Sequence, residues 1–407
     1  MPETTAPLVA LVVEDSAVQR SHLVSLVEDL KIGVVLQAAD GLEALKLLEQ
    51  QPQQRIFLVI TDIDMPGMDG IELIGRLAEG RHVENLIVTS ARDPRLLETV
   101  ESMGAGEERL QLLGTLPKPV TAAALARMLE HARPRRGGPG VKPQFEPSEA
   151  EICRALGAGE FVPYVQPKVS IATGLVKGVE ALARWQHPEH GLLGPQVFIE
   201  RIEGTPLMAR FTLSMVEQAL GHLQDWARAM PALTLSLNLS ADDLADQGFI
   251  DRLTRLVTEH GAMPASLTWE VTETMIMNSQ AMANLARLGL KGFGLSMDDY
   301  GVGYSSMQTL SRSPFTELKI DRIFVNGASE RSNRRAILNS SLDMGRRLGV
   351  CTVAEGVETV EDWKLLAELG CDVAQGYLIA RPMPAGELIG WCRSERARLR
   401  ALAANKA

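Results

Sequence analysis

The sequence predicts an α/β protein of two domains: a doubly wound parallel sheet followed by a TIM-like (β/α)8 barrel. Three observations favour this class. Residues 8–130 alternate short apolar runs with amphipathic segments, which is typical of a parallel sheet covered by helices on both faces. Residues 132–148 are rich in Pro, Gly and Arg and predict a linker. Strand and helix signals then repeat from residue 149 to about 400, close to the roughly 250 residues of one barrel.

The elements of the first domain, residues 1–131, follow in order from its apolar runs. The run LVALVVED predicts a buried strand that ends in acidic residues, and residues 17–30 predict a helix. The runs FLVITDID and ENLIVTS predict two further buried strands. A helical stretch over residues 121–131 closes this domain, and residues 149–156 begin the second.

The bulk properties exclude several classes of protein. The chain has 407 residues, of which 45% are hydrophobic and 23% charged, and its formal net charge is -10. A general nucleic-acid binder would have a basic face, and no part of domain size is basic here. No run approaches the roughly 18 to 20 apolar residues of a membrane span, and the start, MPETTAP, does not resemble a signal peptide. The four cysteines show no CxxC pairing. We therefore expect a cytoplasmic protein with reduced thiols that binds neither nucleic acid nor membrane.

Polar residues follow the predicted strands of the first domain. Glu14 and Asp15 end the first strand, and Asp62 ends a later one. The carboxyl ends of strands in a doubly wound sheet meet in one crevice, where three carboxylates can bind Mg²⁺. Asp62 would then be the nucleophile toward an incoming phosphoryl group. A hydroxyl and an ammonium group that could hold the phosphoryl oxygens come from residues farther along the chain: Thr89 or Ser90, and Lys118.

This set resembles the receiver domain of bacterial response regulators, and the run DIDMPGMDG is its most specific part. The resemblance implies that Asp62 is the phosphoacceptor, that Glu14 and Asp15 hold one Mg²⁺, and that Lys118 binds the phosphate. It also implies a sensor histidine kinase as partner. Two departures concern the relay of the signal: LLGTLPKP lacks the usual aromatic switch residue, and the interval between Thr89 and Lys118 is long. The alternative is a receiver that is not phosphorylated and serves as a dimerisation scaffold.

The apolar runs of the second domain also end in polar residues, one strand after another. The first is Glu180 in EALARW, and the later ends carry these side chains: Asn238, Glu270, Asp298 and Asp299, Lys319 and Asp321, Glu355, and Gln375. Strand ends of a barrel converge on one mouth. Oxygen ligands of this kind suit Mg²⁺ or Mn²⁺, and two such ions about 3.5–4 Å apart assist phosphodiester hydrolysis. On a strand, Lys319 and Asp321 would share a face.

The series resembles the EAL family of cyclic di-GMP phosphodiesterases over about 250 residues. The resemblance implies that a first metal ion binds to Glu180, Asn238, Glu270 and Asp298. It implies that Asp298, Asp299, Asp321 and Glu355 lie near or on a second. Lys319 would lie beside the nucleophilic water, and either Asp298 or Glu355 would accept its proton. Gln375 would contact the substrate or the water network.

Further positions match the substrate side of this family. Gln166, in YVQPKV, would contact a guanine or a phosphate, Leu182 would line the base pocket, and Arg184 would pair with a phosphate. Glu273 matches a glutamate that anchors the loop DDYGVGYSS. Val302 in this loop is bulkier than the usual residue, which predicts altered loop mobility.

The sequence therefore predicts a two-component response regulator that hydrolyses cyclic di-GMP to 5′-pGpG, modulated by phosphorylation of Asp62. The resemblance also implies a homodimer or higher homo-oligomer. One alternative is a barrel that senses cyclic di-GMP without cleaving it, although degenerate members lose ligand residues that are all present here. The other is a scaffold that acts through a partner protein.

Overall fold

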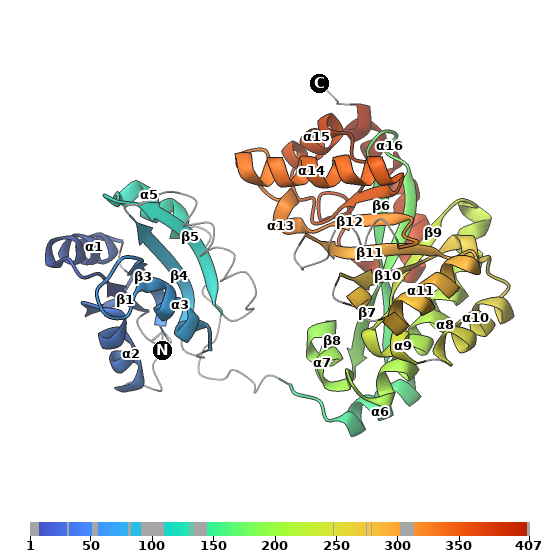
Figure 1. Cartoon of the computed structure of the whole chain (residues 1–407), viewed down its shortest axis with the longest axis horizontal. Helices are drawn as coiled ribbons and strands as arrows, with labels where there is room; N and C mark the ends of the chain where they lie inside the picture. The colour runs from blue at the N-terminus through green and yellow to red at the C-terminus, as the bar shows by residue number, and fades with distance from the viewer. Residues whose placement is uncertain are drawn as a thin grey trace, which may run out of the picture. The chain divides into compact units, whose positions relative to one another are not determined.

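The computed structural model describes residues 8–30, 32–50, 56–79, 83–90, 110–129, 132, 145–246, 248–273, 275–277, 279–301 and 313–404. The chain divides into two compact units, Met1–Gln144 and Phe145–Ala407 (Figure 1). Most of the predicted linker, the long interval after Ser90 and the loop residue Val302 lie outside the described residues.

A parallel sheet with strand order β2-β1-β3-β4-β5 forms the centre of the first unit. The strands and helices are β1 (Val9–Val13), α1 (Ala17–Asp29), β2 (Val34–Ala38), α2 (Gly41–Gln50), β3 (Ile56–Asp62), α3 (Gly70–Glu79), β4 (Val83–Ser90), β5 (Gln111–Pro117) and α5 (Ala122–Leu129).

Helices cover both faces of this sheet. Leu11 of β1 belongs to a core that includes Leu73 of α3. Its neighbour Val12 belongs to a second core, with Leu23 of α1 and Leu125 of α5. Successive side chains of a strand point to opposite faces, so a strand covered on both sides must be apolar throughout. The predicted doubly wound sheet is thereby confirmed.

Strands of the second unit close into a barrel in the order β6-β14-β13-β12-β11-β10-β9-β7, with β7 pairing back to β6. Their bounds are β6 (Phe161–Ser170), β7 (Val176–His187), β9 (Thr234–Asn238), β10 (Leu267–Thr272), β11 (Gly294–Tyr300), β12 (Glu317–Ile320), β13 (Cys351–Ala354) and β14 (Val373–Ala374). Two short strands, β8 (Gly191–Leu193) and β15 (Met383–Pro384), pair with β7 and β6.

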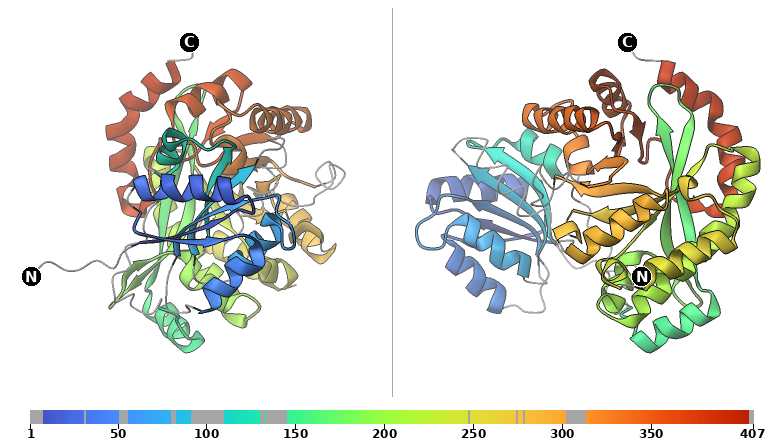
Figure 2. Two further views of the ribbon diagram at one scale, coloured as in Figure 1. Left: turned by 90° about the vertical axis from the view of Figure 1, so that its left-hand side faces the viewer. Right: turned by 45° about the vertical axis from the view of Figure 1, so that its right-hand side comes forward.

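Helices surround this barrel (Figure 2). The α-helices are α6 (Glu149–Ala158), α7 (Ile199–Ile202), α8 (Pro206–Ala229), α9 (Ala241–Ala245), α10 (Phe249–Glu259), α11 (Ser279–Leu290), α13 (Arg322–Val325), α14 (Ser332–Leu348), α15 (Val360–Leu369) and α16 (Leu388–Ala404). Short 3₁₀ turns are η1 (Pro195–Val197), η2 (Pro264–Ser266), η3 (Met275–Met277) and η4 (Ala385–Glu387). The TIM-like class is confirmed.

The strand β6 distinguishes this barrel from a barrel made of eight parallel strands. β6 runs antiparallel to both of its neighbours, β7 and β14. Only residues 171–175 join β6 to β7, and so short a connection permits a hairpin but not a helical crossover. The other strands of the closed barrel pair in parallel and therefore end at the same mouth.

The barrel interior is polar while its outer layer is apolar. On β10, Leu267, Trp269 and Val271 pack in the hydrophobic core. The alternate residue Glu270 is also fully buried, and it contacts lysine side chains from β6 and β12. Because alternate side chains of a strand face opposite ways, the same strand supplies both the core and the polar interior.

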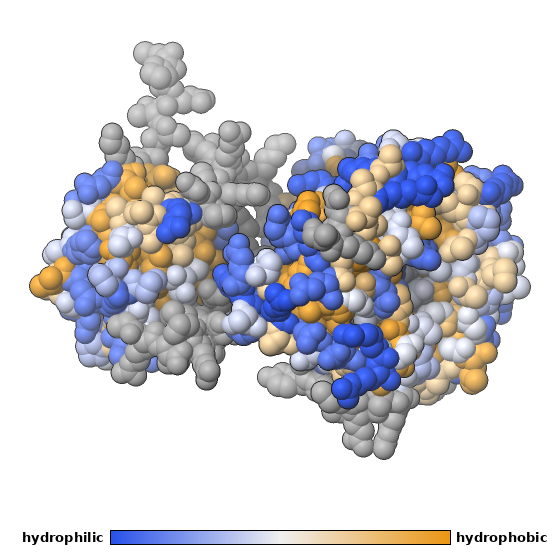
Figure 3. Space-filling view, turned by 90° about the horizontal axis from the view of Figure 1, so that it is seen from above, coloured by the Kyte–Doolittle hydropathy of each residue, from blue (hydrophilic) through white to orange (hydrophobic). Residues whose placement is uncertain are grey.

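On the side shown in Figure 3, hydrophilic residues alternate with hydrophobic areas over the described part of each unit. The most exposed large apolar side chains, Val18, Met263 and Leu290, come from separate elements. Within the described part of the chain, none of the helices has the length and apolarity needed to cross a bilayer.

Candidate functional site

A buried lysine organises the acidic residues at the barrel mouth. The Lys319 side chain, on β12, is 1% exposed. Its Nζ contacts four carboxylates: Glu270 Oε2 at 2.7 Å, Glu355 Oε1 at 2.7 Å, Asp298 Oδ1 at 3.1 Å and Glu180 Oε2 at 3.4 Å. These residues come from β7, β10, β11 and the residue after β13. The closed barrel thus brings together side chains that are up to 175 positions apart in the sequence (from Glu180 to Glu355).

Burial dominates the electrostatics of this cluster. Desolvation raises the pKa of Glu180 to about 7 and that of Glu355 to about 8, with neighbouring carboxylates adding to the effect. Desolvation also raises the pKa of Asp298. For Lys319, burial alone would lower the pKa, but the surrounding carboxylates outweigh it and hold the pKa well above its ordinary value. Four carboxyl groups thus surround one ammonium group, and once deprotonated they can bind cations.

Glu270 behaves differently because it lies between two ammonium groups. Burial would raise its pKa, but Lys319 and Lys168 outweigh this and lower the pKa to about 2. Lys168 Nζ lies 3.4 Å from Glu270 Oε1 and 2.8 Å from Glu317 Oε1, and it donates to Ser236 Oγ at 2.6 Å. Lys168 was not among the site residues predicted from the sequence. The available signal was its position two residues after Gln166, which places both on one face of a strand.

A second group of acids, beside the lysine, offers oxygen ligands for a metal ion. Asp298, Asp299 and Glu355 each offer an oxygen, and these atoms all lie within 4.8 Å of one another. Burial, together with the neighbouring carboxylates of Asp298 and Asp321, raises the pKa of Asp299 to about 6. Asp299 adopts φ 53°, a left-handed conformation that redirects the chain after Asp298. Carboxylate oxygens at this spacing fit a hard divalent cation.

Asp321 is placed differently from the expectation. β12 ends at Ile320, so Asp321 does not share a strand face with Lys319. Its Oδ1 accepts a hydrogen bond of 2.7 Å from the Ile323 backbone and caps α13. It still lies near enough to Asp299 to raise the pKa of that carboxyl group.

Amide side chains hold the first acid of the site. Asn238 Nδ2 donates to Glu180 Oε1 at 3.1 Å, and Gln375 Nε2 donates to Glu180 Oε2 at 2.6 Å. Gln375 also donates to Gln166 Oε1 at 3.0 Å, and Gln166 donates to the Ala380 carbonyl at 3.0 Å. Both oxygens of Glu180 are therefore oriented by amides, one from the neighbouring strand β9 and one from the residue after β14.

The two parts of the sequence match two family models. Residues 149–382 match the EAL domain, and residues 10–130 match the response regulator receiver domain. The chain belongs to the EAL domain family. The EAL resemblance and the receiver resemblance drawn from the motifs are both confirmed.

Relatives match this chain over nearly its whole length or over part of it. The cyclic di-GMP phosphodiesterase RocR of Pseudomonas aeruginosa is 35% identical over 392 residues, which cover 94% of this chain and 98% of that protein. The bifunctional diguanylate cyclase/cyclic di-GMP phosphodiesterase MucR of the same species is 38% identical over 242 residues, which cover 59% of this chain and 35% of that protein. The solved complex of the PaMucR phosphodiesterase with c-di-GMP is similar at 38% identity and a TM-score of 0.57. It covers 59% of this chain and 98% of that chain.

Other predicted positions of the EAL domain lie at its mouth. Leu182 pairs with Tyr164 across β6 and β7, and the guanidinium of Arg184 lies 5.8 Å from the centre of the Tyr164 ring. Arg184 Nη1 donates to the Ala183 carbonyl at 2.7 Å. Glu273 is 3% exposed just after β10, while most of the loop that it is predicted to anchor lies outside the described residues.

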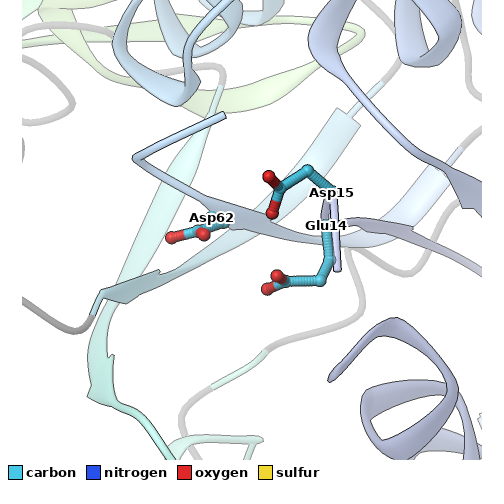
Figure 4. A group of neighbouring side chains, drawn as sticks. All are labelled: Glu14, Asp15 and Asp62. Carbon is cyan, nitrogen blue, oxygen red and sulfur yellow. The ribbon is translucent and has the colours of Figure 1, made fainter. Parts of the chain in front are cut away.

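The receiver domain presents its own acidic site. Glu14, Asp15 and Asp62 project from the carboxyl ends of β1 and β3 (Figure 4), and each offers an oxygen within 4.8 Å of the others. Lys118 Nζ lies 2.7 Å from Glu14 Oε2 and 2.5 Å from Asp62 Oδ2. Burial raises the pKa of Glu14. Burial would lower the pKa of Lys118, but its bonds to Asp62 and Glu14 outweigh this and raise it.

The two hydroxyls of the receiver domain are buried at the end of β4. Thr89 is paired with Asp62 across β3 and β4, and its Oγ1 donates to the Thr61 carbonyl at 3.3 Å. Ser90 pairs with Pro117, one residue before Lys118. All the predicted residues of this site thus meet at one edge of the sheet.

Proposed function

We propose that this protein hydrolyses cyclic di-GMP to 5′-pGpG in the barrel, with Mg²⁺ or Mn²⁺ as cofactor. The observation that carries the proposal is the buried Lys319 with four carboxylates around it, at the mouth of an EAL domain. The similarity to RocR over 94% of the chain supports the substrate. The amide-held Glu180 and the carboxylate pair Asp298–Asp299 fit the oxygen ligands that such ions prefer.

Two bound divalent ions would activate water and stabilise the entering and leaving oxygens of the phosphodiester. We assign the first ion to Glu180, Asn238, Glu270 and Asp298, and the second to Asp298, Asp299, Asp321 and Glu355. In the receiver domain, one Mg²⁺ is assigned to Glu14, Asp15 and Asp62.

The chain's own residues position the reactants. Lys319 would donate to the attacking water and to the negative charge that develops on the phosphoryl oxygens. Glu355 is the better of the two candidate bases, because its side chain is 19% exposed while that of Asp298 is 14% exposed. A proton taken up by Glu355 can therefore pass to solvent more readily. Arg184 would pair with a phosphate, with Gln166 and Leu182 beside the base.

Phosphorylation of Asp62 by a sensor histidine kinase is proposed to modulate this hydrolysis. Asp62 is 5% exposed, and Lys118 already contacts its Oδ2. An ammonium in this place would neutralise a phosphoryl group on Asp62.

The deciding experiment is cyclic di-GMP turnover with Mg²⁺ for the wild type, Glu355→Ala and Lys319→Ala. Formation of pGpG by the wild type alone supports the enzyme. Tight binding without product in all three proteins would instead indicate a sensor of cyclic di-GMP. A homo-oligomer is a further expectation, which light scattering at several protein concentrations tests.

A further inference from the structure

A second buried lysine lies in the barrel interior and has no role in the reaction as described so far. Lys168 comes from β6, and its side chain is 3% exposed. Its Nζ donates to Ser236 Oγ at 2.6 Å and lies 2.8 Å from Glu317 Oε1 and 3.4 Å from Glu270 Oε1. These partners come from three other strands, β9, β12 and β10. Because the contacts converge from three directions, they hold the ammonium group in one place.

Lys168 lies between the acidic cluster and the end of the barrel opposite the mouth. On β12, Glu317 precedes Lys319 by two residues, so both side chains share a face, and Glu317 is nearer the amino end of the strand. A hollow of about 1000 Å³ is lined by Lys168, Glu317 and Thr234, among others. Thr234 and Glu317 are the first residues of β9 and β12, so the hollow opens at the amino ends of the strands.

The two buried lysines contact different oxygens of Glu270. Oε2 lies 2.7 Å from Lys319 Nζ, and Oε1 lies 3.4 Å from Lys168 Nζ. Ser236 adds a second link, because its hydroxyl accepts from Lys168 and also hydrogen-bonds to Glu270. The carboxylate is thus held on both sides, and Oε2 is the oxygen next to Lys319 and the other acids of the mouth. A carboxylate oxygen has two lone pairs, so Oε2 can accept from Lys319 and still bind a metal ion.

We propose that Lys168 is a positioning residue for metal binding, which holds Glu270 by Oε1 and so presents Oε2 to the first metal ion. This inference rests on the proposed function, because it concerns the same site. Lys168 acts through Glu270 rather than on the substrate, and Glu317 in turn holds Lys168. Replacing a residue that orients a metal ligand typically weakens metal binding by about 10- to 100-fold.

Positioning and charge repulsion predict opposite effects of removing this lysine. A buried ammonium group repels a cation, so Lys168→Met would strengthen metal binding if charge alone mattered. If Lys168 orients Glu270, the same change weakens binding despite the gain in negative charge. The sign of the change in metal affinity therefore distinguishes the two.

The test is Mn²⁺ binding by isothermal titration calorimetry in the absence of substrate. All proteins carry Asp15→Asn and Asp62→Asn, which remove two of the three carboxylates assigned to the metal ion of the receiver domain. Lys168→Met should raise the Kd for Mn²⁺ about tenfold. Lys177→Met is the matched control, because Lys177 lines the same hollow at an exposed position. Its charge is screened by solvent, so the Kd should stay within about twofold of the parent value.

A double variant covers the case in which Lys168→Met does not fold. Loss of Lys168 leaves the Glu317 carboxylate, which is 14% exposed, without its partner. Lys168→Met combined with Glu317→Gln removes both charges and should recover stability. Glu270 is still not held in this protein, so its Kd should remain about tenfold above the parent value. A double variant that binds Mn²⁺ as tightly as the parent would overturn the proposal, and so would tighter binding in Lys168→Met.

Turnover separates this proposal from the proposed function. With the native receiver residues, Lys168→Met should need about tenfold more Mn²⁺ for half-maximal hydrolysis, while KM for cyclic di-GMP at saturating Mn²⁺ stays within about twofold of wild type. A raised KM at saturating Mn²⁺ would show that Lys168 acts on substrate binding, contrary to the proposal. Absence of hydrolysis by the wild type would refute the phosphodiesterase, while the calorimetry would still decide whether Lys168 positions Glu270.

Discussion

Lys319 Nζ lies 2.7 Å from Glu270 Oε2 inside the barrel, and neither side chain is more than 1% exposed. The same ammonium contacts three further carboxylates. A buried charge of this kind is stable only while its partners remain, because removal of one member leaves the others uncompensated in a medium of low dielectric constant.

Replacement of Lys319 by Met is therefore expected to affect both activity and stability. Turnover of cyclic di-GMP should fall at least about 100-fold, since the group beside the reacting phosphoryl oxygens is lost. The metal-free variant should be less stable by about 3–5 kcal/mol in urea unfolding. Lys364→Met, at an exposed position of α15, is the matched control and should change neither. Turnover within tenfold of wild type would contradict this role for Lys319.

The stability of the metal-free protein should fall as the pH rises from 6 to 9. The pKa values of Glu180 and Glu355 are raised to about 7 and about 8, from an ordinary value of 4.5. The folded state therefore binds these protons more tightly than the unfolded state. Their stabilising contribution is complete below the unfolded pKa and is lost as the pH passes through 7 and 8. Glu270, with a pKa of about 2, stays ionised throughout this window.

Divalent metal should reverse this trend, because the ions bind the deprotonated carboxylates. The rise in Tm on adding Mg²⁺ or Mn²⁺ to protein in EDTA should increase from pH 6 to pH 8.5 in differential scanning fluorimetry. Glu355→Gln removes one of the titrating groups and should flatten the dependence. A metal-induced shift in Tm that is the same at all pH values would disagree with the buried acidic site.

Asp62→Asn should abolish phosphorylation of the receiver by acetyl phosphate, as seen by intact-protein mass spectrometry. The reason is that the acyl phosphate forms on this carboxylate. Asp64→Asn, two residues later at an exposed position, should still gain one phosphoryl group. Beryllofluoride should change the rate of cyclic di-GMP hydrolysis in the wild type and not in Asp62→Asn. An equal response in both proteins would mean that beryllofluoride affects hydrolysis by a route other than Asp62.

Arg184→Lys should weaken substrate binding without stopping catalysis. The planar guanidinium can contact a phosphate through two nitrogens, whereas an ammonium is a point charge. We expect KM for cyclic di-GMP to rise about tenfold and kcat to remain within about threefold, on the basis of one charge-assisted hydrogen bond. Arg393→Lys, exposed on α16, provides the comparison. A lower kcat at unchanged KM would instead indicate that Arg184 stabilises the transition state.

Short sequence patterns were sufficient to predict much of the fold. The apolar run before Asp62 indicated a strand buried on both faces, and that strand is β3 with every residue buried. Residues 17–30 indicated the helix observed as α1. The acids after the run SLNLS, Asp242 and Asp243, lie in the first turn of α9. In the structure Asp243 forms a capping box with Ser240, while Asp242 accepts a hydrogen bond from the Gly204 backbone.

The direction of β6 and the position of Asp321 could not be predicted from the sequence. β6 is as apolar as its neighbours, and nothing in its composition indicates that it runs antiparallel to them. The strand signal of LKIDR continues through Asp321, but β12 ends one residue earlier, at Ile320, and Asp321 is the N-cap of α13. Strand ends depend on where the backbone finds its next hydrogen-bond partner, which local propensity specifies poorly.

The sequence by itself determined the two domains, the order of their strands and helices, and the acids that follow each strand, because these depend on periodicity and on short motifs. Only the tertiary structure decided which of these acids share Lys319, that Lys168 approaches Glu270 from a distant strand, and how far each pKa departs from its ordinary value. Those properties depend on the closure of the barrel and on burial, since the strength of a charge interaction depends on the distance between the groups and on the exclusion of water.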